Sequence, residues 1–192
     1  MECLAKIMET APLPVIMVSY LTVTGAKQTI DALELGAVDF VTKPSKDIAT
    51  LGNIQKELVQ KVKLAATIRV NKLKKVVSQR QGLADSFKPP KNLDLVTIGS
   101  STGGPRALRH LLGMFPKNFP LGTVVAQHMP KGFTKVFASH LNDVCEIEIS
   151  EAKNGDLVKP GKVLIAPSGK QITLHRTSSN ELAVEVGNQP DL

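Results

Sequence analysis

The sequence of 192 residues predicts an α/β protein with two small domains. Short apolar runs alternate with helical patterns in both halves of the chain, which is typical of parallel sheets. A basic stretch over residues 67–92 separates these halves, so we expect domains at 1–66 and 93–192. Towards the end of the chain the apolar runs are short and follow turn sequences, which favours antiparallel hairpins.

The first domain is expected to contain a parallel sheet with helices. Its pattern is helix, strand, helix, strand and amphipathic helix, joined by short loops. Gly36 is expected to end the second helix, and Lys43-Pro44 to stop the second strand. The expected elements cover residues 4–8, 14–18, 26–35, 37–41 and 51–65.

The second domain is expected to be part of a doubly wound α/β domain with an antiparallel hairpin region. A strand, a Gly-rich turn and a helix open it, and a strand, a helix and an alternating strand follow. Three further runs are predicted to be hairpin strands because turn sequences such as Pro160-Gly161 separate them. The expected strands are 95–98, 122–126, 145–149, 163–166, 172–174 and 182–186, and the expected helices run through 108–112 and 133–141.

The distribution of charge argues against a nucleic-acid-binding protein despite the net charge of +7. Residues 48–92 hold 10 basic and 2 acidic residues, whereas the segments before and after them are nearly neutral. No aromatic residue is interleaved with these basic residues until Phe87, so we expect a solvated helix face and a linker. The sequence also lacks a membrane-spanning apolar run and a secretory signal, so we expect a cytoplasmic protein.

The clearest chemical motif is Gly99-Ser100-Ser101-Thr102-Gly103, which fits G-x-S-x-G between a strand and a helix. Such a turn presents a serine oxygen above the carboxyl end of the strand, beside helix amides that can stabilise an oxyanion. The glycine spacing selects Ser101 rather than Ser100. A turn that merely caps a helix is an open alternative; a phosphate-binding loop is disfavoured because the required glycine and lysine are missing.

A serine nucleophile needs a base, and His128 is the best placed of the four histidines. It follows the strand at 122–126, whose carboxyl end should lie beside that of the strand before Ser101. His110 and His140 fall in helical patterns, and His175 alternates with apolar residues, so we expect all three to be structural or exposed.

No convincing acid completes a triad within the sequence. Asp143, Asp156 and Asp191 are available, but none ends a predicted parallel strand. Asp156 belongs to an Asn-Gly-Asp turn, where side-chain hydrogen bonding to the backbone explains it.

These residues resemble the chemotaxis response-regulator methylesterases, the CheB family, which are also protein-glutamine deamidases. The resemblance rests on four motifs in the family's order: residues 98–104, Gln127-His-Met-Pro130 with Gly132-Phe-Thr134, Pro160-Gly161 and Ile165-Ala-Pro167. It implies a nucleophile at Ser101, a base at His128, and Thr102 and Gly103 lining the site. No cofactor is implied for the esterase. The family's catalytic aspartate would fall beyond Leu192, so we expect negligible turnover from these 192 residues alone.

The opening segment resembles the second half of a receiver domain. The resemblance assigns Ser19 as the switch hydroxyl, Phe40 as the switch aromatic and Lys43 as the lysine that contacts the phosphoryl group. Tyr20 departs from the small residue expected beside the switch serine. The phosphoacceptor aspartate and the acidic pair that holds Mg²⁺ would precede Met1.

For a complete enzyme the resemblance implies hydrolysis of glutamate methyl esters on chemoreceptors, with a histidine kinase as phosphoryl donor. From the charge distribution and the hydropathy we expect no nucleic-acid partner and no membrane insertion. Two alternatives remain open: a non-catalytic response-regulator or receptor-binding module, and an unrelated serine esterase, against which the receiver-like segment counts.

Overall fold

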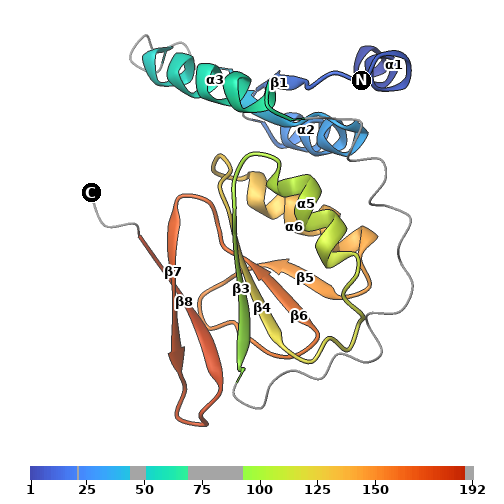
Figure 1. The fold of residues 1–192 in the computed structure, drawn as a ribbon. Helices are drawn as coiled ribbons and strands as arrows, with labels where there is room; N and C mark the ends of the chain where they lie inside the picture. Colours follow the sequence, from blue (N-terminus) through green and yellow to red (C-terminus); the bar gives the residue numbers. More distant parts are fainter. Residues whose placement is uncertain (21, 44–50, 69–92, 189–192) are drawn as a thin grey trace. The chain divides into compact units, whose positions relative to one another are not determined.

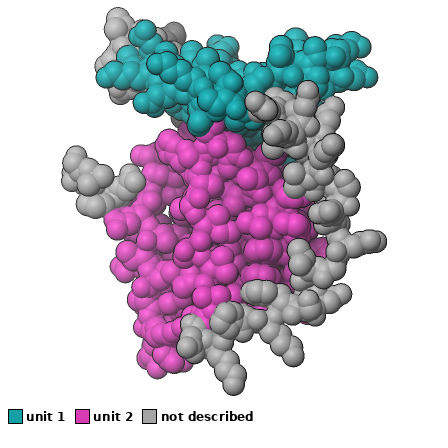
Figure 2. Space-filling view, viewed as in Figure 1, with its two compact units in different colours: residues 1–79 teal, residues 80–192 magenta. Residues whose placement is uncertain are grey.

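The computed structural model describes residues 1–20, 22–43, 51–68 and 93–188 (Figure 1). The chain divides into two compact units, residues 1–79 and 80–192, which Figure 2 colours separately. Most of the predicted linker lies outside the described residues, so the predicted domain boundaries remain a prediction. Among the helices of the four described ranges, none is long and apolar enough to cross a membrane.

The described residues of unit 1 form two parallel strands and three helices, in the order predicted from the sequence. Strand β1 (Ile16–Ser19) pairs with β2 (Asp39–Thr42), in a register that sets Ser19 opposite Thr42. The helices are α1 (Glu2–Thr10), α2 (Val23–Leu35) and α3 (Leu51–Ala65).

Local capping explains the bounds of α2. The side chain of Thr22 accepts a hydrogen bond from the amide of Gly25 at 2.9 Å, so the helix begins three residues before the predicted start. Gly36 ends it, as predicted, with a left-handed φ of 115° that side chains with a Cβ rarely adopt. Capping at both ends therefore fixes the helix between β1 and β2.

Helix α3 is fastened to β2 by a half-buried lysine. Lys61 donates a hydrogen bond to the carbonyl of Phe40 at 2.6 Å and lies 3.3 Å from a carboxylate oxygen of Asp39. It also pairs with Glu57 one turn earlier on the helix, at 3.0 Å. Because Asp39 is only 6% exposed, Lys61 supplies the counter-charge that a buried carboxylate needs.

Unit 2 is built on a four-stranded parallel sheet in the order β3-β4-β6-β5. Its strands are β3 (Leu95–Ser100), β4 (Gly122–Gln127), β5 (Glu148–Glu151) and β6 (Lys162–Ile165). Helix α5 (Gly104–Leu112) connects β3 to β4, and α6 (Phe133–Val144) connects β4 to β5. An antiparallel hairpin of β7 (Lys170–Arg176) and β8 (Leu182–Asn188) follows, as predicted.

The prediction of a hairpin strand at 163–166 was wrong. The segment forms β6, a parallel strand between β4 and β5. Val163, Leu164 and Ile165 are each 0% exposed, so the run is buried on both faces, as central strands of parallel sheets are. The turn at Pro160-Gly161 misled the prediction, because it ends a helix-free crossover from β5 rather than a hairpin loop.

The sheet of unit 2 lies between two helices and the hairpin (Figure 1). Helices α5 and α6 cover one face with fully buried side chains such as Leu112, Phe137 and Leu141. On the other face, Val124 and Leu164 pack with Val184 of the hairpin. In the described part of the chain, helices therefore cover one face of the sheet, whereas a doubly wound domain carries them on both.

Candidate active site

The structure brings Ser101 and His128 together at one edge of the unit 2 sheet. Ser101 directly follows β3 and His128 directly follows β4, and the register pairs their preceding residues, Ser100 and Gln127. The Ser101 Oγ lies 3.5 Å from the His128 Nδ1, and both side chains are exposed. Because the strands are parallel, their carboxyl ends deliver a hydroxyl and an imidazole to the same rim.

The turn after Ser101 leads tightly into α5. Gly103 is the N-cap and adopts φ of 75°, which explains a glycine at this position. The amide of Gly104 donates to the carbonyl of Ser101 at 2.8 Å, closing the turn. The serine therefore lies beside the amino-terminal end of a nine-residue helix, where the helix dipole favours negative charge.

Two amides at this turn are available to an anion. Among the described residues, neither the Thr102 nor the Gly103 amide has a hydrogen-bond acceptor. Both follow Ser101 immediately, in the turn that precedes a helix. Amides in this position can donate to an oxyanion that develops on a carbonyl attacked by the serine.

The side chain of Gln127 ties the two strand ends together. Its Nε2 donates to the carbonyl oxygens of both Ser101 and His128, at 3.0 Å each. Its Oε1 accepts a 2.6 Å hydrogen bond from the Ser100 hydroxyl. Gln127 is 6% exposed, so these bonds are sheltered from water. One buried amide thus fixes the backbone of both candidate catalytic residues.

Gly104 makes room for that amide. A Cβ at position 104 would lie 2.0 Å from Gln127 Oε1 and 3.0 Å from Ser100 Cβ. By contrast, a Cβ at Gly99 or Gly103 would meet nothing within 4 Å. The glycine that closely approaches a neighbour is therefore Gly104, just outside the G-x-S-x-G motif.

The loop that carries His128 is anchored on its other side. The Ser168 hydroxyl donates to the carbonyl of Met129, and the Ser168 amide donates to Thr134 Oγ1 at 3.1 Å. Thr134 in turn donates to Glu151 at the end of β5, at 2.6 Å. Hydrogen bonds thus join the segments after β4 and β6 to the last residue of β5 at the same sheet edge.

Within the described part of the chain, no carboxylate bonds to the His128 imidazole, whose Nδ1 faces the Ser101 hydroxyl. Asp143 lies in α6, and Asp156 accepts a hydrogen bond from the Lys153 amide at 2.8 Å, which confirms its role in a turn. Asp191 lies outside the described residues.

The other three histidines lie within helices and a strand rather than directly after β3 or β4. His110 lies in α5, His140 in α6 and His175 in β7, on the kinds of element predicted for them. None of the three directly follows β3 or β4 in the sequence. The imidazole next to the Ser101 hydroxyl is that of His128.

In unit 1 the proposed switch residues lie on β1, on β2 and directly after β2. Ser19 ends β1, and its carbonyl accepts a 2.6 Å hydrogen bond from the amide of Lys43, which follows β2. The ammonium of Lys43 lies 4.4 Å from the ring centre of Tyr20, a cation–π contact. Phe40 is 2% exposed within β2. Ser19 and Lys43 are therefore neighbours, while Phe40 belongs to the core.

Gln127 and Gly104 were not among the candidates from sequence reasoning. A signal for each existed: a second glycine follows the G-x-S-x-G motif, and a glutamine directly precedes the candidate base. Neither signal specifies that the two residues touch, because this depends on the register between β3 and β4.

A serine on a strand-to-helix turn, with an imidazole next to its hydroxyl, is a pairing that serine hydrolases use for nucleophile and base. Residues 96–190 match the family model described as CheB methylesterase. A protein-glutamate methylesterase/protein-glutamine glutaminase of Archaeoglobus fulgidus is 41% identical over 184 residues, which cover 93% of this chain and 52% of that relative. One of Sulfurimonas denitrificans is 43% identical over 185 residues, with 92% and 52% covered.

Among solved structures, the CheB methylesterase catalytic domain of Thermotoga maritima is 41% identical, with a TM-score of 0.49 and 52% of each chain covered. The chain spans about half the length of the curated relatives that it matches. On the family model and these relatives, the chain belongs to the CheB methylesterase family.

Proposed function

We propose that this chain supplies the nucleophile and the base of a protein-glutamate methylesterase that also deamidates glutamine. The proposal is carried by the 3.5 Å approach of Ser101 Oγ to His128 Nδ1 at an exposed sheet edge. It agrees with the activity in the names of the relatives. The proposed substrate is a methylated glutamate side chain on a chemoreceptor.

In this mechanism, Ser101 attacks the side-chain carbonyl carbon of the glutamate ester while His128 accepts the hydroxyl proton. The resulting oxyanion faces the amides of Thr102 and Gly103 at the start of α5. When the tetrahedral intermediate collapses, methanol leaves with the proton from His128. Water then hydrolyses the acyl-serine, and His128 again acts as the base. With glutamine as the substrate, the same steps release ammonia.

The separation of 3.5 Å is longer than a formed hydrogen bond between these groups, about 2.7–3.2 Å. Hydrogen bonds between catalytic groups are often loose before substrate binds and tighten in the complex. The remaining distance to close is about 0.3 Å or more. Because Gln127 holds the backbone beneath both residues, we assign this movement to the two exposed side chains.

A reactive γ-nitrophenyl ester of a glutamyl peptide tests the proposal on the 192-residue chain. We expect one acyl group per chain, located on Ser101 by mass spectrometry of a tryptic digest. The label should be absent from Ser101→Ala and strongly slowed in His128→Gln. Ser100→Ala is the matched control, because it removes the neighbouring hydroxyl that is engaged with Gln127. Acylation of Ser100, or unchanged labelling of Ser101→Ala, would overturn the proposal.

We further propose that unit 1 is receiver-like and regulates the esterase. In this proposal Ser19 and Lys43 act at a phosphorylation site that a histidine kinase and Mg²⁺ would serve, with Phe40 as the responding aromatic residue. The adjacency of Ser19 and Lys43 supports it. The test is incubation with acetyl phosphate and Mg²⁺ of a protein that includes the expected phosphoacceptor aspartate; we expect a phosphorylated aspartate outside residues 1–192, with a lower yield in Lys43→Ala. Phosphorylation of Asp39, whose carboxylate instead neutralises Lys61, would contradict this assignment.

A further inference from the structure

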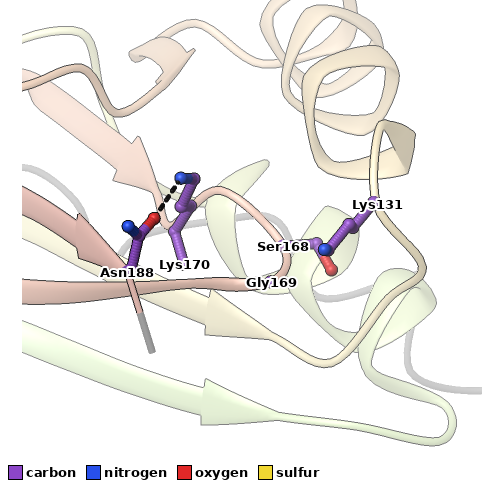
Figure 3. Close-up of a pocket in the computed structure, with 5 residues that line it drawn as sticks. All are labelled: Lys131, Ser168, Gly169, Lys170 and Asn188. Atoms are coloured by element: carbon purple, nitrogen blue, oxygen red, sulfur yellow. Dashed lines mark hydrogen bonds between the residues drawn. The ribbon is translucent and has the colours of Figure 1, made fainter. Parts of the chain in front are cut away.

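At the sheet edge where β4 and β6 end, unit 2 has a basic hollow of about 410 Å³. It is lined by Lys131, Ser168, Gly169, Lys170 and Asn188, and we call it the lysine hollow. Figure 3 shows Lys131 and Ser168 on one side of Gly169, and Lys170 with Asn188 on the other. Its volume lies within the range of sites that hold small ligands or single side chains.

The lysine hollow is formed in part by loops that follow β4 and β6, at the same sheet edge as Ser101 and His128. Lys131 is three residues after His128, in the loop between β4 and α6, and Ser168 follows β6. The Ser168 hydroxyl bonds to the carbonyl of Met129, the residue next to His128. A group bound in the hollow therefore contacts the loop that carries the candidate base.

The hollow carries two positive charges, those of Lys131 and Lys170. In the described residues, no carboxylate pairs with Lys131 or Lys170. The ammonium of Lys170 donates to the neutral Oδ1 of Asn188 at 2.7 Å. Two ammonium groups around one hollow repel each other, and a carboxylate between them would remove this repulsion and accept charge-assisted hydrogen bonds.

The position of Lys131 is set by close packing rather than by a salt bridge. Its aliphatic stem lies over Gly169, so that a Cβ at 169 would meet Lys131 Cε at 2.5 Å and Cγ at 3.0 Å. Gly169 also has φ of 75°, a conformation that suits glycine. The turn after β6 thus leaves space for the lysine stem and holds its ammonium at the hollow.

We propose that the lysine hollow is a substrate-recognition site for acidic side chains that flank the target glutamate on the substrate protein. This inference rests on the proposed function, which identifies the substrate as a protein side chain. The site binds the neighbours of the scissile ester and takes no part in the chemistry. A protein segment with glutamates beside the ester is therefore preferred over one with uncharged neighbours.

Binding of two matched helical peptides tests this proposal. Both carry one glutamate methyl ester and a fluorophore; one has glutamates beside the ester, and the other has glutamines in their place. Fluorescence anisotropy is measured with the 192-residue chain carrying Ser101→Ala, so that no turnover occurs. We expect the acidic peptide to bind roughly tenfold more tightly at low salt, and the difference to shrink as salt screens the charges.

Lysine substitutions locate the binding. Lys131→Gln or Lys170→Gln should weaken binding of the acidic peptide about threefold, and the double variant should weaken it roughly tenfold. Binding of the glutamine peptide should change little. Lys159→Gln is the control, because it removes the same charge from an exposed residue before β6, at the opposite end of that strand. Gly169→Ala keeps both charges but displaces Lys131, so it should also weaken binding of the acidic peptide.

The proposal is overturned if both peptides bind alike, or if Lys159→Gln weakens binding as much as the double variant does. It is also overturned if vesicles of phosphatidylglycerol or inorganic phosphate bind in a lysine-dependent manner while the acidic peptide does not. Failure of the proposed function is a separate result, since it would appear as missing acylation of Ser101. Thermal unfolding of each variant verifies that the compared proteins are folded.

Discussion

Replacing Gly104 by alanine should disturb the site more than the same replacement at Gly99 or Gly103. The new Cβ would lie 2.0 Å from Gln127 Oε1, so this oxygen must retreat by about 1.4 Å to reach an ordinary contact of 3.4 Å. Such a shift breaks its 2.6 Å hydrogen bond with the Ser100 hydroxyl. It also pulls Nε2 away from the carbonyls of Ser101 and His128.

The expected cost follows from these contacts. Overpacking costs typically 1–3 kcal/mol, and each lost hydrogen bond about 0.5–1.5 kcal/mol. Alanine recovers up to about 1 kcal/mol of helix propensity at the first residue of α5. With all three hydrogen bonds of Gln127 disturbed, these contributions combine to roughly 1.5–7.5 kcal/mol, so we expect the free energy of unfolding to fall by at least about 1.5 kcal/mol, together with slower acylation of Ser101.

Urea unfolding and the nitrophenyl ester assay measure both effects. Gly99→Ala is the matched control, because a Cβ there meets nothing within 4 Å and the residue lies in a strand. Its stability should stay the same or rise by up to about 1 kcal/mol. A Gly104→Ala variant that is as stable as the parent chain and acylates at the same rate would contradict this prediction.

Three further substitutions test separate parts of the structure. Gln127→Glu keeps the side-chain size but removes both donated hydrogen bonds. The maximal acylation rate should therefore fall by up to about 10²-fold, with little change in the ester concentration at half-saturation. If only the concentration at half-saturation changes, Gln127 has no positioning role. Leu164→Ala empties a fully buried site and should lower the free energy of unfolding by about 2–5 kcal/mol in urea titration, and a cost under about 1 kcal/mol contradicts the packing described. Lys61→Ala leaves the Asp39 carboxylate buried without its cation and should destabilise unit 1 by about 3 kcal/mol at neutral pH; adding Asp39→Asn should restore part of the loss in thermal unfolding, and no restoration contradicts the pairing.

Much of the fold could be predicted because local signals and chain order agree. The capping of α2 by Gly36, the apolar strand runs and the helical periodicity each predict one element, and parallel pairing follows from their alternation. The prediction failed at β6 because a Pro-Gly turn before a short apolar run is ambiguous. Complete burial of Val163, Leu164 and Ile165 resolves it, and burial depends on the whole sheet.

The dyad could be predicted for a similar reason. Ser101 and His128 each follow an apolar strand directly, so topology alone brings them near each other. The Gln127 contacts and the lysine hollow could not be predicted, because they depend on the register between β3 and β4 and on the path of the loop after β6. An acid for His128 was not predicted within the sequence, and no carboxylate pairs with it among the described residues.

The central claim is that Ser101 and His128 act as one reactive pair at the edge of the unit 2 sheet. A crystal structure of the chain after reaction with a fluorophosphonate tests this claim most directly. We expect a phosphonyl group on Ser101 Oγ, a ring nitrogen of His128 within hydrogen-bond distance of the adduct, and a phosphonyl oxygen at the amides of Thr102 and Gly103. A modified residue other than Ser101, or a His128 ring turned away from the adduct, would contradict it.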